Sequence, residues 1–268
     1  MKRQLLGVAA ILLSISTYAQ DNPLWMRYCA ISPDGTSIAF TYKGDIYTVP
    51  VNGGKAAQIT TNAAHDTHPV WSPDGKQIAF ASDRMGSMDI FVVDREGGIP
   101  KRLTTHSGNE TPVAFKDADH ILFLANVMPS AEDAQFPSGQ FQQVYEVSTT
   151  GDRPVMFSSM PMEDISINKT GNALLYHDKK GYEDPWRKHH TSSITRDIWL
   201  CSLDGKRSYR KLTSFNGEDR TPVWASDGKS FYYLSEEKGS FNVFKRALDG
   251  TTSTQLTHHT KHPVRFLT

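Results

Sequence analysis

The sequence predicts an all-β chain folded as a β-propeller of four-stranded antiparallel blades. Three observations support this fold class: a turn motif recurs along the chain, short alternating apolar runs follow each turn, and equivalent strand starts recur every 44 to 54 residues. Because a single repeat cannot bury both faces of its own sheet, stacking of the repeats has to supply the core.

A turn motif recurs in each repeat and is followed by a strand-like run. Proline fixes φ and glycine accepts a positive φ, so Pro-Asp-Gly predicts a tight turn between antiparallel strands. The copies are Ser32-Pro33-Asp34-Gly35, Ser72-Pro73-Asp74-Gly75, Lys116-Asp117-Ala118-Asp119, Asn168-Lys169-Thr170-Gly171 and Ala225-Ser226-Asp227-Gly228. The runs that follow include Ile38-Ala39-Phe40, Ile78-Ala79-Phe80, Ile121-Leu122-Phe123, Leu174-Leu175-Tyr176 and Phe231-Tyr232-Tyr233. Such β-branched and aromatic runs are typical of half-buried strands.

Further strand signals complete each repeat. One strand starts at each of Asp45, Asp89, Gln143, Asp197 and Asn242. The outermost strand leads into the pairs Ile59-Thr60, Leu103-Thr104, Leu212-Thr213 and Leu256-Thr257. The next repeat then opens with Pro69-Val70-Trp71, Pro112-Val113-Ala114, Pro222-Val223-Trp224 or Pro263-Val264-Arg265. Four short strands per repeat are the blade of a propeller.

The repeats predict five complete blades and the start of a sixth. The blades are placed at about residues 24–61, 66–105, 110–160, 162–215 and 219–260, and the sixth begins at His262. One strand alone would leave the edges of its sheet unpaired. We therefore expect the natural polypeptide to continue beyond Thr268 and the complete ring to have six blades.

Residues 1–19 have the pattern of a secretory signal peptide, and the propeller is predicted at 20–268. Lys2 and Arg3 precede an apolar run at 5–15, and Thr17 and Ala19 supply the small residues before the expected cleavage site. The run is shorter than the about 20 residues that span a bilayer, so no membrane span is expected after cleavage. The predicted location is outside the cytoplasm, periplasmic or extracellular.

Composition and charge exclude several functional classes. The chain has 29 Lys and Arg against 29 Asp and Glu, so it lacks the excess positive charge that binds nucleic acid. Its two cysteines, Cys29 and Cys201, cannot build a disulfide-rich scaffold or a four-thiolate zinc site, and the sequence leaves their pairing open. No cofactor is expected.

Most of the ten histidines fall in predicted loops on one face of the ring. If the strands of a blade run A to D from the inside outwards, the B–C and D–A loops share a face. This candidate binding face includes His65, His68, His106, His258, His259 and His262, with the acids Asp66, Glu110, Glu218 and Asp219. The histidine groups come from connections several blades apart. A polar binding face or channel mouth is therefore favoured, and no metal site is predicted.

The stretch that differs most from the other repeats lies in the predicted B–C loop of the fourth blade, at 178–196. It contains Trp186, Arg187, Lys188, His189 and His190. Trp and Arg are frequent anchors of protein interfaces, so these residues are predicted to dock a partner, with a solvated loop as the alternative.

No catalytic residue is predicted. The sequence has neither a Gly-x-Ser-x-Gly elbow nor a His-Glu-x-x-His helix. Ser166, Ser226 and Ser235 each precede a lysine by three positions, but all three lie in predicted turns or strand ends.

The segment from Pro69 to Gly98, PVWSPDGKQIAFASDRMGSMDIFVVDREGG, resembles the PD40 repeat of TolB-like propellers. This resemblance covers nearly all of residues 24–268 and implies the propeller fold. Among proteins with such repeats, the chain looks most like the first propeller of tricorn-like serine proteases of the S41 class. The stretch from Asp184 to Trp199 is similar to an insertion in bacterial members of that family.

The resemblance implies a non-catalytic propeller of an exported tricorn-like serine peptidase, one that guides or filters peptide substrates or products. The catalytic residues of such a protein would lie beyond Thr268. Its partners would be peptides or unfolded protein segments and the downstream protease domains of the same polypeptide, and a homo-oligomer is an open question. The alternatives are a TolB-like envelope module that binds proteins without enzymatic activity, and the propeller of a dipeptidyl-peptidase-like serine protease.

Overall fold

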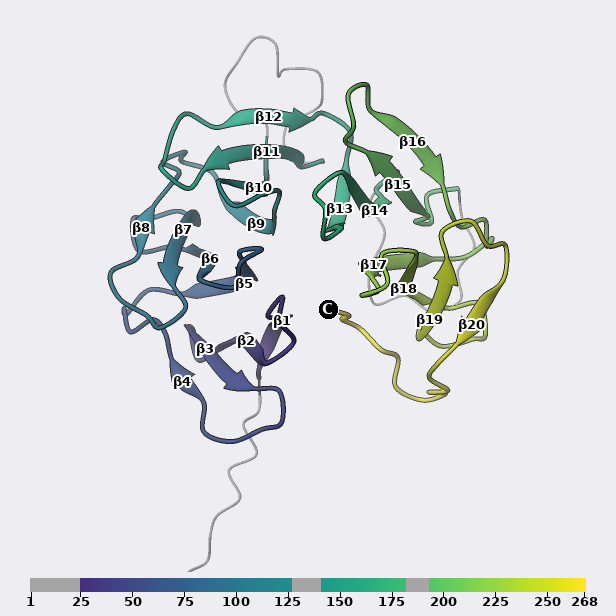
Figure 1. Cartoon of the computed structure of the whole chain (residues 1–268), viewed down its shortest axis with the longest axis horizontal. Coiled ribbons are helices and arrows are strands. Elements are labelled where there is room, and N and C mark those ends of the chain that lie inside the picture. The colour runs from purple at the N-terminus through teal and green to yellow at the C-terminus, as the bar shows by residue number, and fades with distance from the viewer. Residues whose placement is uncertain (1–24, 127–140, 182–192) are drawn as a thin grey trace, which may run out of the picture.

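The chain forms five four-stranded antiparallel sheets arranged as blades around a common axis (Figure 1). The computed structural model describes residues 25–126, 141–181 and 193–268. The predicted all-β propeller with four-stranded antiparallel blades is confirmed, and five blades are seen. Within the described residues, no helix is long and apolar enough to cross a bilayer.

Each blade uses its four strands in sequence order from the axis outwards. The inner strands are β1 (Arg27–Ile31), β5 (Asp66–Trp71), β9 (Glu110–Phe115), β13 (Met162–Ile167) and β17 (Asp219–Trp224). The second strands are β2 (Ser37–Tyr42), β6 (Gln77–Ser82), β10 (His120–Ala125), β14 (Ala173–Asp178) and β18 (Ser230–Ser235). The third strands are β3 (Asp45–Pro50), β7 (Asp89–Asp94), β11 (Gln143–Ser148), β15 (Ile198–Ser202) and β19 (Asn242–Ala247). The outer strands are β4 (Ala57–Gln58), β8 (Lys101–Arg102), β12 (Val155–Ser158), β16 (Ser208–Lys211) and β20 (Ser253–Gln255).

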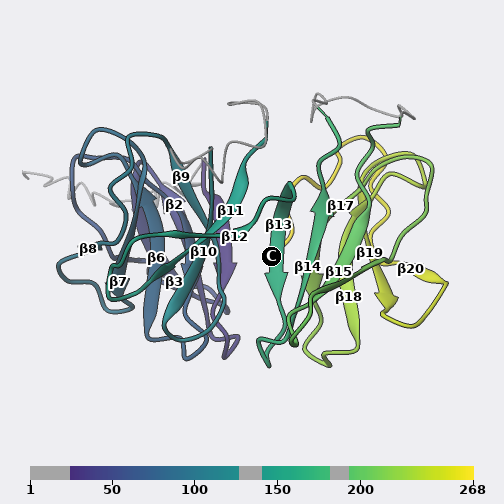
Figure 2. The ribbon, with the colours of Figure 1, turned by 90° about the horizontal axis from the view of Figure 1, so that it is seen from above.

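The inner strands of successive blades contact one another and run roughly along the ring axis (Figure 2). After β20 the chain returns from the fifth blade toward the axis, and Thr268 lies between β1 and β17 (Figure 1). No strand is formed in the described segment 256–268, where the sequence predicts the start of a sixth blade. A strand exists through pairing with a neighbouring strand, and this segment has none in the structure.

The turn after each inner strand is closed by the side chains of its own motif. In the first copy, Ser32 Oγ donates to Asp34 Oδ1 at 2.5 Å and accepts the Ser37 N–H at 2.9 Å. Gly35 has φ +69°, a conformation that an L side chain rarely adopts, and its N–H donates to the Ser32 carbonyl. These bonds explain why serine, aspartate and glycine recur together at this turn.

The core consists of side chains that pack between neighbouring blades. Large residues on one face of the second blade, such as Phe80 and Phe91, are buried against smaller residues of the first blade, such as Ala39 and Ile46. Two tryptophans also link inner strands by hydrogen bonds: Trp71 Nε1 donates to the Ala30 carbonyl, and Trp224 Nε1 donates to the Ser166 carbonyl. The stacking expected from the repeats is therefore the main source of buried apolar surface.

A threonine after each of four outer strands caps the neighbouring strand. The Oγ1 atom of this threonine accepts the N–H of the residue near the start of the third strand, at 2.9 to 3.0 Å. The pairs are Ile46 with Thr60, Ile90 with Thr104, Ile198 with Thr213, and Val243 with Thr257. The blade thereby satisfies a buried donor that the very short outer strand cannot reach.

A backbone hydrogen bond then links the next segment of the chain to the preceding blade. In three blades, the first residue of the next inner strand donates its backbone N–H to a carbonyl near the start of the third strand of the preceding blade. Val264 makes the equivalent bond after the fifth blade. The pairs are Asp66 to Gly44, Glu110 to Met88, Asp219 to Arg196 and Val264 to Phe241, at 2.7 to 3.1 Å. We call this bond, together with the threonine cap beside it, the threonine clasp.

At two junctions the clasp also holds a carboxyl group from the following blade. Thr104 Oγ1 donates to Glu110, and Thr213 provides a side-chain hydrogen bond to Asp219. Burial raises the pKa of Glu110 from 4.5 to about 7 and that of Asp219 from 3.8 to about 7, against the lowering effect of these hydrogen bonds. At the fifth blade, where Val264 offers no acid, Thr257 donates to Asn242 of its own blade.

Replacement of Thr104 by valine tests the clasp. The variant leaves the Ile90 N–H without its acceptor and Glu110 without its donor, so we expect a loss of about 2–3 kcal/mol in the free energy of unfolding. Thr105→Val, at an exposed neighbouring position, serves as the matched control and should change stability little. Denaturant unfolding measures both variants, and equal stabilities would contradict the assignment.

Replacement of Glu110 by glutamine tests the buried carboxyl. Between pH about 4.5 and 7 the folded state keeps a proton that the unfolded state releases, so the free energy of unfolding falls as the pH rises. The loss is complete above pH 7 and is about 3 kcal/mol. Glu110→Gln should flatten this part of the stability–pH curve, whereas the exposed control Glu96→Gln should leave it unchanged. A parallel curve for Glu110→Gln would refute the raised pKa.

Candidate axial site

The pairing of every inner strand shifts register once, and in four of the five strands the shift contains a residue with left-handed backbone. The pairing of β1, β5, β13 and β17 with their neighbours shifts register between Arg27 and Ala30, Thr67 and Val70, Glu163 and Ser166, and Arg220 and Val223. Each shift contains one non-glycine residue in the left-handed region. These residues are Tyr28, His68, Asp164 and Thr221, with φ between 49° and 54°. We call them the axial cluster.

The axial cluster stores backbone strain at equivalent points of four blades. A non-glycine residue in the left-handed region costs on the order of 1 kcal/mol. His68 and Thr221 also precede prolines, a position that favours extended backbone instead. Strain of this kind concentrates at functional sites, and bulges are a common means of redirecting a side chain.

The axial cluster residues contact one another across blade boundaries. The Tyr28 and His68 rings are stacked, with centroids 3.6 Å apart and an interplanar angle of 29°. On the other side of the axis, Thr221 Oγ1 donates to Asp164 Oδ2 at 2.6 Å. The first and second blades thus share an aromatic pair, and the fourth and fifth blades share a carboxylate–hydroxyl pair.

His68 is neutral at pH 7. Burial, followed by the nearby charge of His65, lowers the pKa of His68 from 6.5 to about 4. The Asp164 carboxylate opposes this shift, which shows that the influence of its charge reaches His68 across the axis. The cluster therefore presents one negative charge, on Asp164, opposite two uncharged aromatic rings.

A buried polar network supports Asp164 and Thr221 from behind. His177 is 3% exposed; its Nδ1 accepts the Thr221 N–H at 3.2 Å, so the proton lies on Nε2, which is 3.2 Å from Glu163 Oε2. Lys179 Nζ lies 2.7 Å from Glu163 Oε1. Burial disfavours the charged form of Glu163, but the hydrogen bonds from His177 and Lys179, with the charge of Lys179, outweigh it and hold the pKa of Glu163 below its ordinary value.

The network continues along the junction of the fourth and fifth blades. Arg196 Nη1 lies 2.5 Å from Glu218 Oε1, and Arg220 Nη1 lies 3.8 Å from the same oxygen. The Arg220 guanidinium also covers the Phe241 ring at 4.1 Å from its centroid. Both guanidinium groups are thus held beside the buried Glu218 carboxylate, next to the strands that carry Asp164 and Thr221.

The described candidate histidines are distributed around the ring. His68 is in the axial cluster, and His65 lies near it. His106 Nδ1 accepts the Gly108 N–H between the second and third blades. His258, His259 and His262 are exposed in the segment after β20. Among the described residues, no three His, Cys, Asp or Glu side chains are grouped to hold a metal ion.

The structure bears differently on the predicted docking residues, the predicted acidic residues and the two cysteines. Trp186, Arg187, Lys188, His189 and His190 lie outside the described residues. The acids Asp66, Glu110, Glu218 and Asp219, which the sequence places on a polar face, are at most 2% exposed and lie between blades. Cys29 is exposed and Cys201 is buried, and both thiols are free.

Sequence reasoning missed Tyr28, Asp164 and Thr221. The signal that could have found two of the cluster members is the residue before proline at the start of an inner strand, His68 before Pro69 and Thr221 before Pro222. Tyr28 and Asp164 have no such marker, because a bulge depends on the partner strand as well as on its own sequence.

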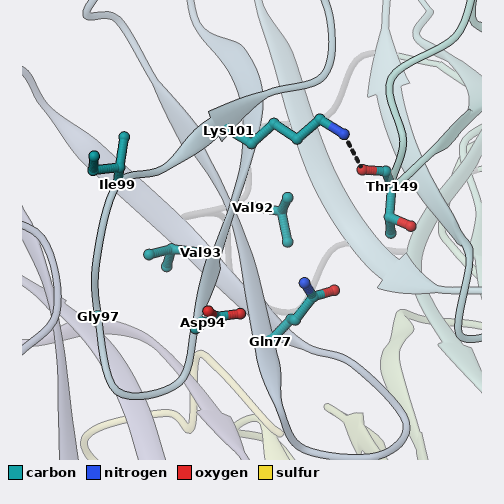
Figure 3. Close-up of a pocket in the computed structure, with 8 residues that line it drawn as sticks. All are labelled: Gln77, Val92, Val93, Asp94, Gly97, Ile99, Lys101 and Thr149. Carbon is teal, nitrogen blue, oxygen red and sulfur yellow. Dashed lines mark hydrogen bonds between the residues drawn. The ribbon is translucent and has the colours of Figure 1, made fainter.

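A groove on the outside of the ring, between the second and third blades, is a weaker candidate (Figure 3). It encloses about 230 Å³, is lined partly by Val92, Val93 and Ile99, and is bridged where Lys101 Nζ donates to the Thr149 carbonyl at 3.1 Å. Its volume is below the usual range for small-molecule sites, about 300–1,000 Å³.

The charge of Asp164 can be tested through the titration of His68. Because Asp164 raises the pKa of His68, Asp164→Asn should move the His68 midpoint below about 4. An NMR titration of the His68 ring measures it, with Asp152→Asn at an exposed site as the control. An unchanged midpoint in Asp164→Asn would place the two side chains too far apart to interact.

Comparison with known proteins supports the fold and identifies the family. Residues 23–268 match the model of the tricorn protease N-terminal beta propeller domain. Tricorn protease homolog 1 of Streptomyces coelicolor is 25% identical over 229 residues, which cover 85% of this chain and 20% of the relative. The chain spans about a fifth of the length of the curated tricorn relatives it matches.

Solved structures show the same architecture. The crystal structure of the tricorn protease matches with a TM-score of 0.70 and 20% identity, covering 89% of this chain and 23% of that one. TolB from Acinetobacter baumannii matches with a TM-score of 0.63 and 18% identity, covering 88% of this chain and 55% of that one. By its blades and by its match over nearly its whole length, the chain belongs to the family of tricorn protease N-terminal beta propeller domains.

Proposed function

We propose that this chain is the non-catalytic propeller of an exported tricorn-like serine peptidase, in which it guides or filters peptides along the ring axis. The observation that carries the proposal is the axial cluster: four strained residues from four blades present polar and aromatic groups at one level of the axis. Membership of the tricorn propeller family supplies the peptidase context.

The proposed partners follow from this role. Peptides or unfolded segments would meet the axial cluster, and downstream protease domains of the same polypeptide would receive or release them. Self-association into a homo-oligomer is a further part of the proposal and would place several such axes around one assembly.

A sixth blade is proposed to complete the ring. Ala39 and Ile46 of the first blade pack on the second blade, so the alternate residues face the other way. On that face Ile38, Tyr47 and Val49 are only half-buried, whereas their counterparts in the second blade, Ile78, Phe91 and Val93, are buried. An apolar sheet face of this kind calls for a covering layer. Amide hydrogen exchange in β2 and β3 should be slower in the full-length protein than in this chain alone.

The export part of the proposal rests on the sequence at residues 1–19. Its positive start, apolar run and small residues before the cleavage site are those of a signal peptide. Periplasmic or extracellular location is therefore proposed for the mature protein.

Deletion of residues 24–268 from the full-length peptidase tests the role of the propeller. We expect the variant to cleave small unstructured peptides but to lose the selection by size that an axial path imposes. Cleavage rates for a series of peptides of increasing length measure this selection. Identical rates and identical length dependence in the two proteins would contradict the proposal.

The fold similarity to TolB favours one alternative, an envelope module that binds a protein partner without enzymatic activity. Trp186 and Arg187 would then be docking residues. Capture of envelope proteins by the chain should weaken when Trp186→Ala and Arg187→Ala are combined, and undiminished capture by the double variant would exclude that surface.

A further inference from the structure

We propose that the axial cluster binds the cationic side chain of a lysine or arginine, so that the propeller favours basic peptides. This inference rests on the proposed peptide-guiding role and adds the chemical class of the peptide. It depends on three features of the axial cluster: an uncompensated carboxylate, a neutral aromatic pair and a rigid backbone.

The Asp164 carboxylate is available to a ligand. Its side chain is 48% exposed, and Thr221 Oγ1 occupies Oδ2 only, so within the described residues no hydrogen bond reaches Oδ1. The nearest ring nitrogen, His177 Nδ1, is 3.6 Å from Oδ2, but it accepts the Thr221 N–H and so carries no proton for Asp164. Asp164 therefore has no cationic partner at contact distance among the described residues.

Three cations of the network behind Asp164 are already paired with other acids. Lys179 is held by Glu163, and Arg196 by Glu218. Arg220, on which the Asp164 charge also acts, is held by Glu218 and by the Phe241 ring. Movement of any of these side chains toward Asp164 would weaken an ion pair at Glu163 or at the buried Glu218, whereas a pair with the half-exposed Asp164 returns little.

The aromatic pair complements the carboxylate. A cation is attracted to the face of an aromatic ring, with about 0.5–1 kcal/mol at exposed sites and more where water is excluded. His68 is uncharged, so it does not repel the incoming cation, and it holds Tyr28 by stacking. A guanidinium both stacks on aromatic rings and donates to a carboxylate, so arginine should bind more tightly than lysine.

The backbone holds these groups before any ligand arrives. The left-handed bulges fix where Tyr28, His68 and Asp164 leave their strands, and the hydrogen bond from Thr221 orients the carboxylate. A preorganised site loses less entropy on binding than a flexible one.

The experiment compares two fluorescently labelled peptides of equal length that differ at one central residue, arginine in one and glutamine in the other. Binding to this chain is measured by fluorescence anisotropy. The arginine peptide should bind about five- to tenfold more tightly, a ratio that corresponds to about 1 kcal/mol. Asp164→Asn keeps an acceptor for Thr221 and should remove the preference, as should Tyr28→Leu in part. Asp152→Asn removes the same charge at an exposed distant site and should retain the preference.

The outcomes separate the two proposals. If neither peptide binds, the peptide-guiding role fails and this inference fails with it. If both bind equally, the guiding role stands and the cation site is refuted. If the arginine preference persists in Asp164→Asn, with its fold intact by circular dichroism, the cation is recognised elsewhere and the assignment is wrong.

Discussion

The threonine clasp is the interaction on which the remainder of this propeller depends. Each outer strand has only two to four residues, so it cannot pair with the whole length of the third strand. In four of the five blades the threonine that follows supplies the missing acceptor, and a later N–H of the chain donates back to the same blade. The clasp therefore fixes the point at which the chain leaves one blade and starts the next, and no long sheet edge is needed to do so.

The clasp helps to fix the position of two residues of the axial cluster. Asp66 and Asp219 are clasped to the preceding blade, and the bulge residues His68 and Thr221 come two positions later in the same strands. The backbone between the clasped residues and the point where strand pairing resumes after the bulge can adopt few conformations. At His68 and Thr221 the left-handed conformation is thus held from both sides, which is how a strained residue persists in a folded chain. The clasp at Thr213 serves both purposes, because it also contacts the buried carboxyl of Asp219.

The repeat pattern predicted the fold because turn, strand and threonine recur in sequence. Gly35 and its equivalents mark turns that any copy needs, and the alternation of Ile78 and Phe80 reports burial directly. The site was harder to predict. His68 was found as part of a polar face, but its partners Tyr28 and Asp164 come from blades far away in sequence. Asp66 and Glu110 look like surface charge in a linear reading, and only the stacking of blades shows that they are buried. Such side chains acquire their role from neighbours that the local pattern does not contain.

In the fifth blade the threonine hydroxyl donates to a side chain of the same blade, from Thr257 to Asn242. In the second and fourth blades the acceptor is an acid of the following blade. This difference bears on folding during synthesis. As the chain leaves the ribosome, the second and fourth blades stay incomplete until Glu110 and Asp219 emerge. The fifth blade can satisfy its own polar groups as soon as it is made. The polar contact of Thr257 therefore forms within one blade, whereas those of Thr104 and Thr213 need the chain to reach the next blade.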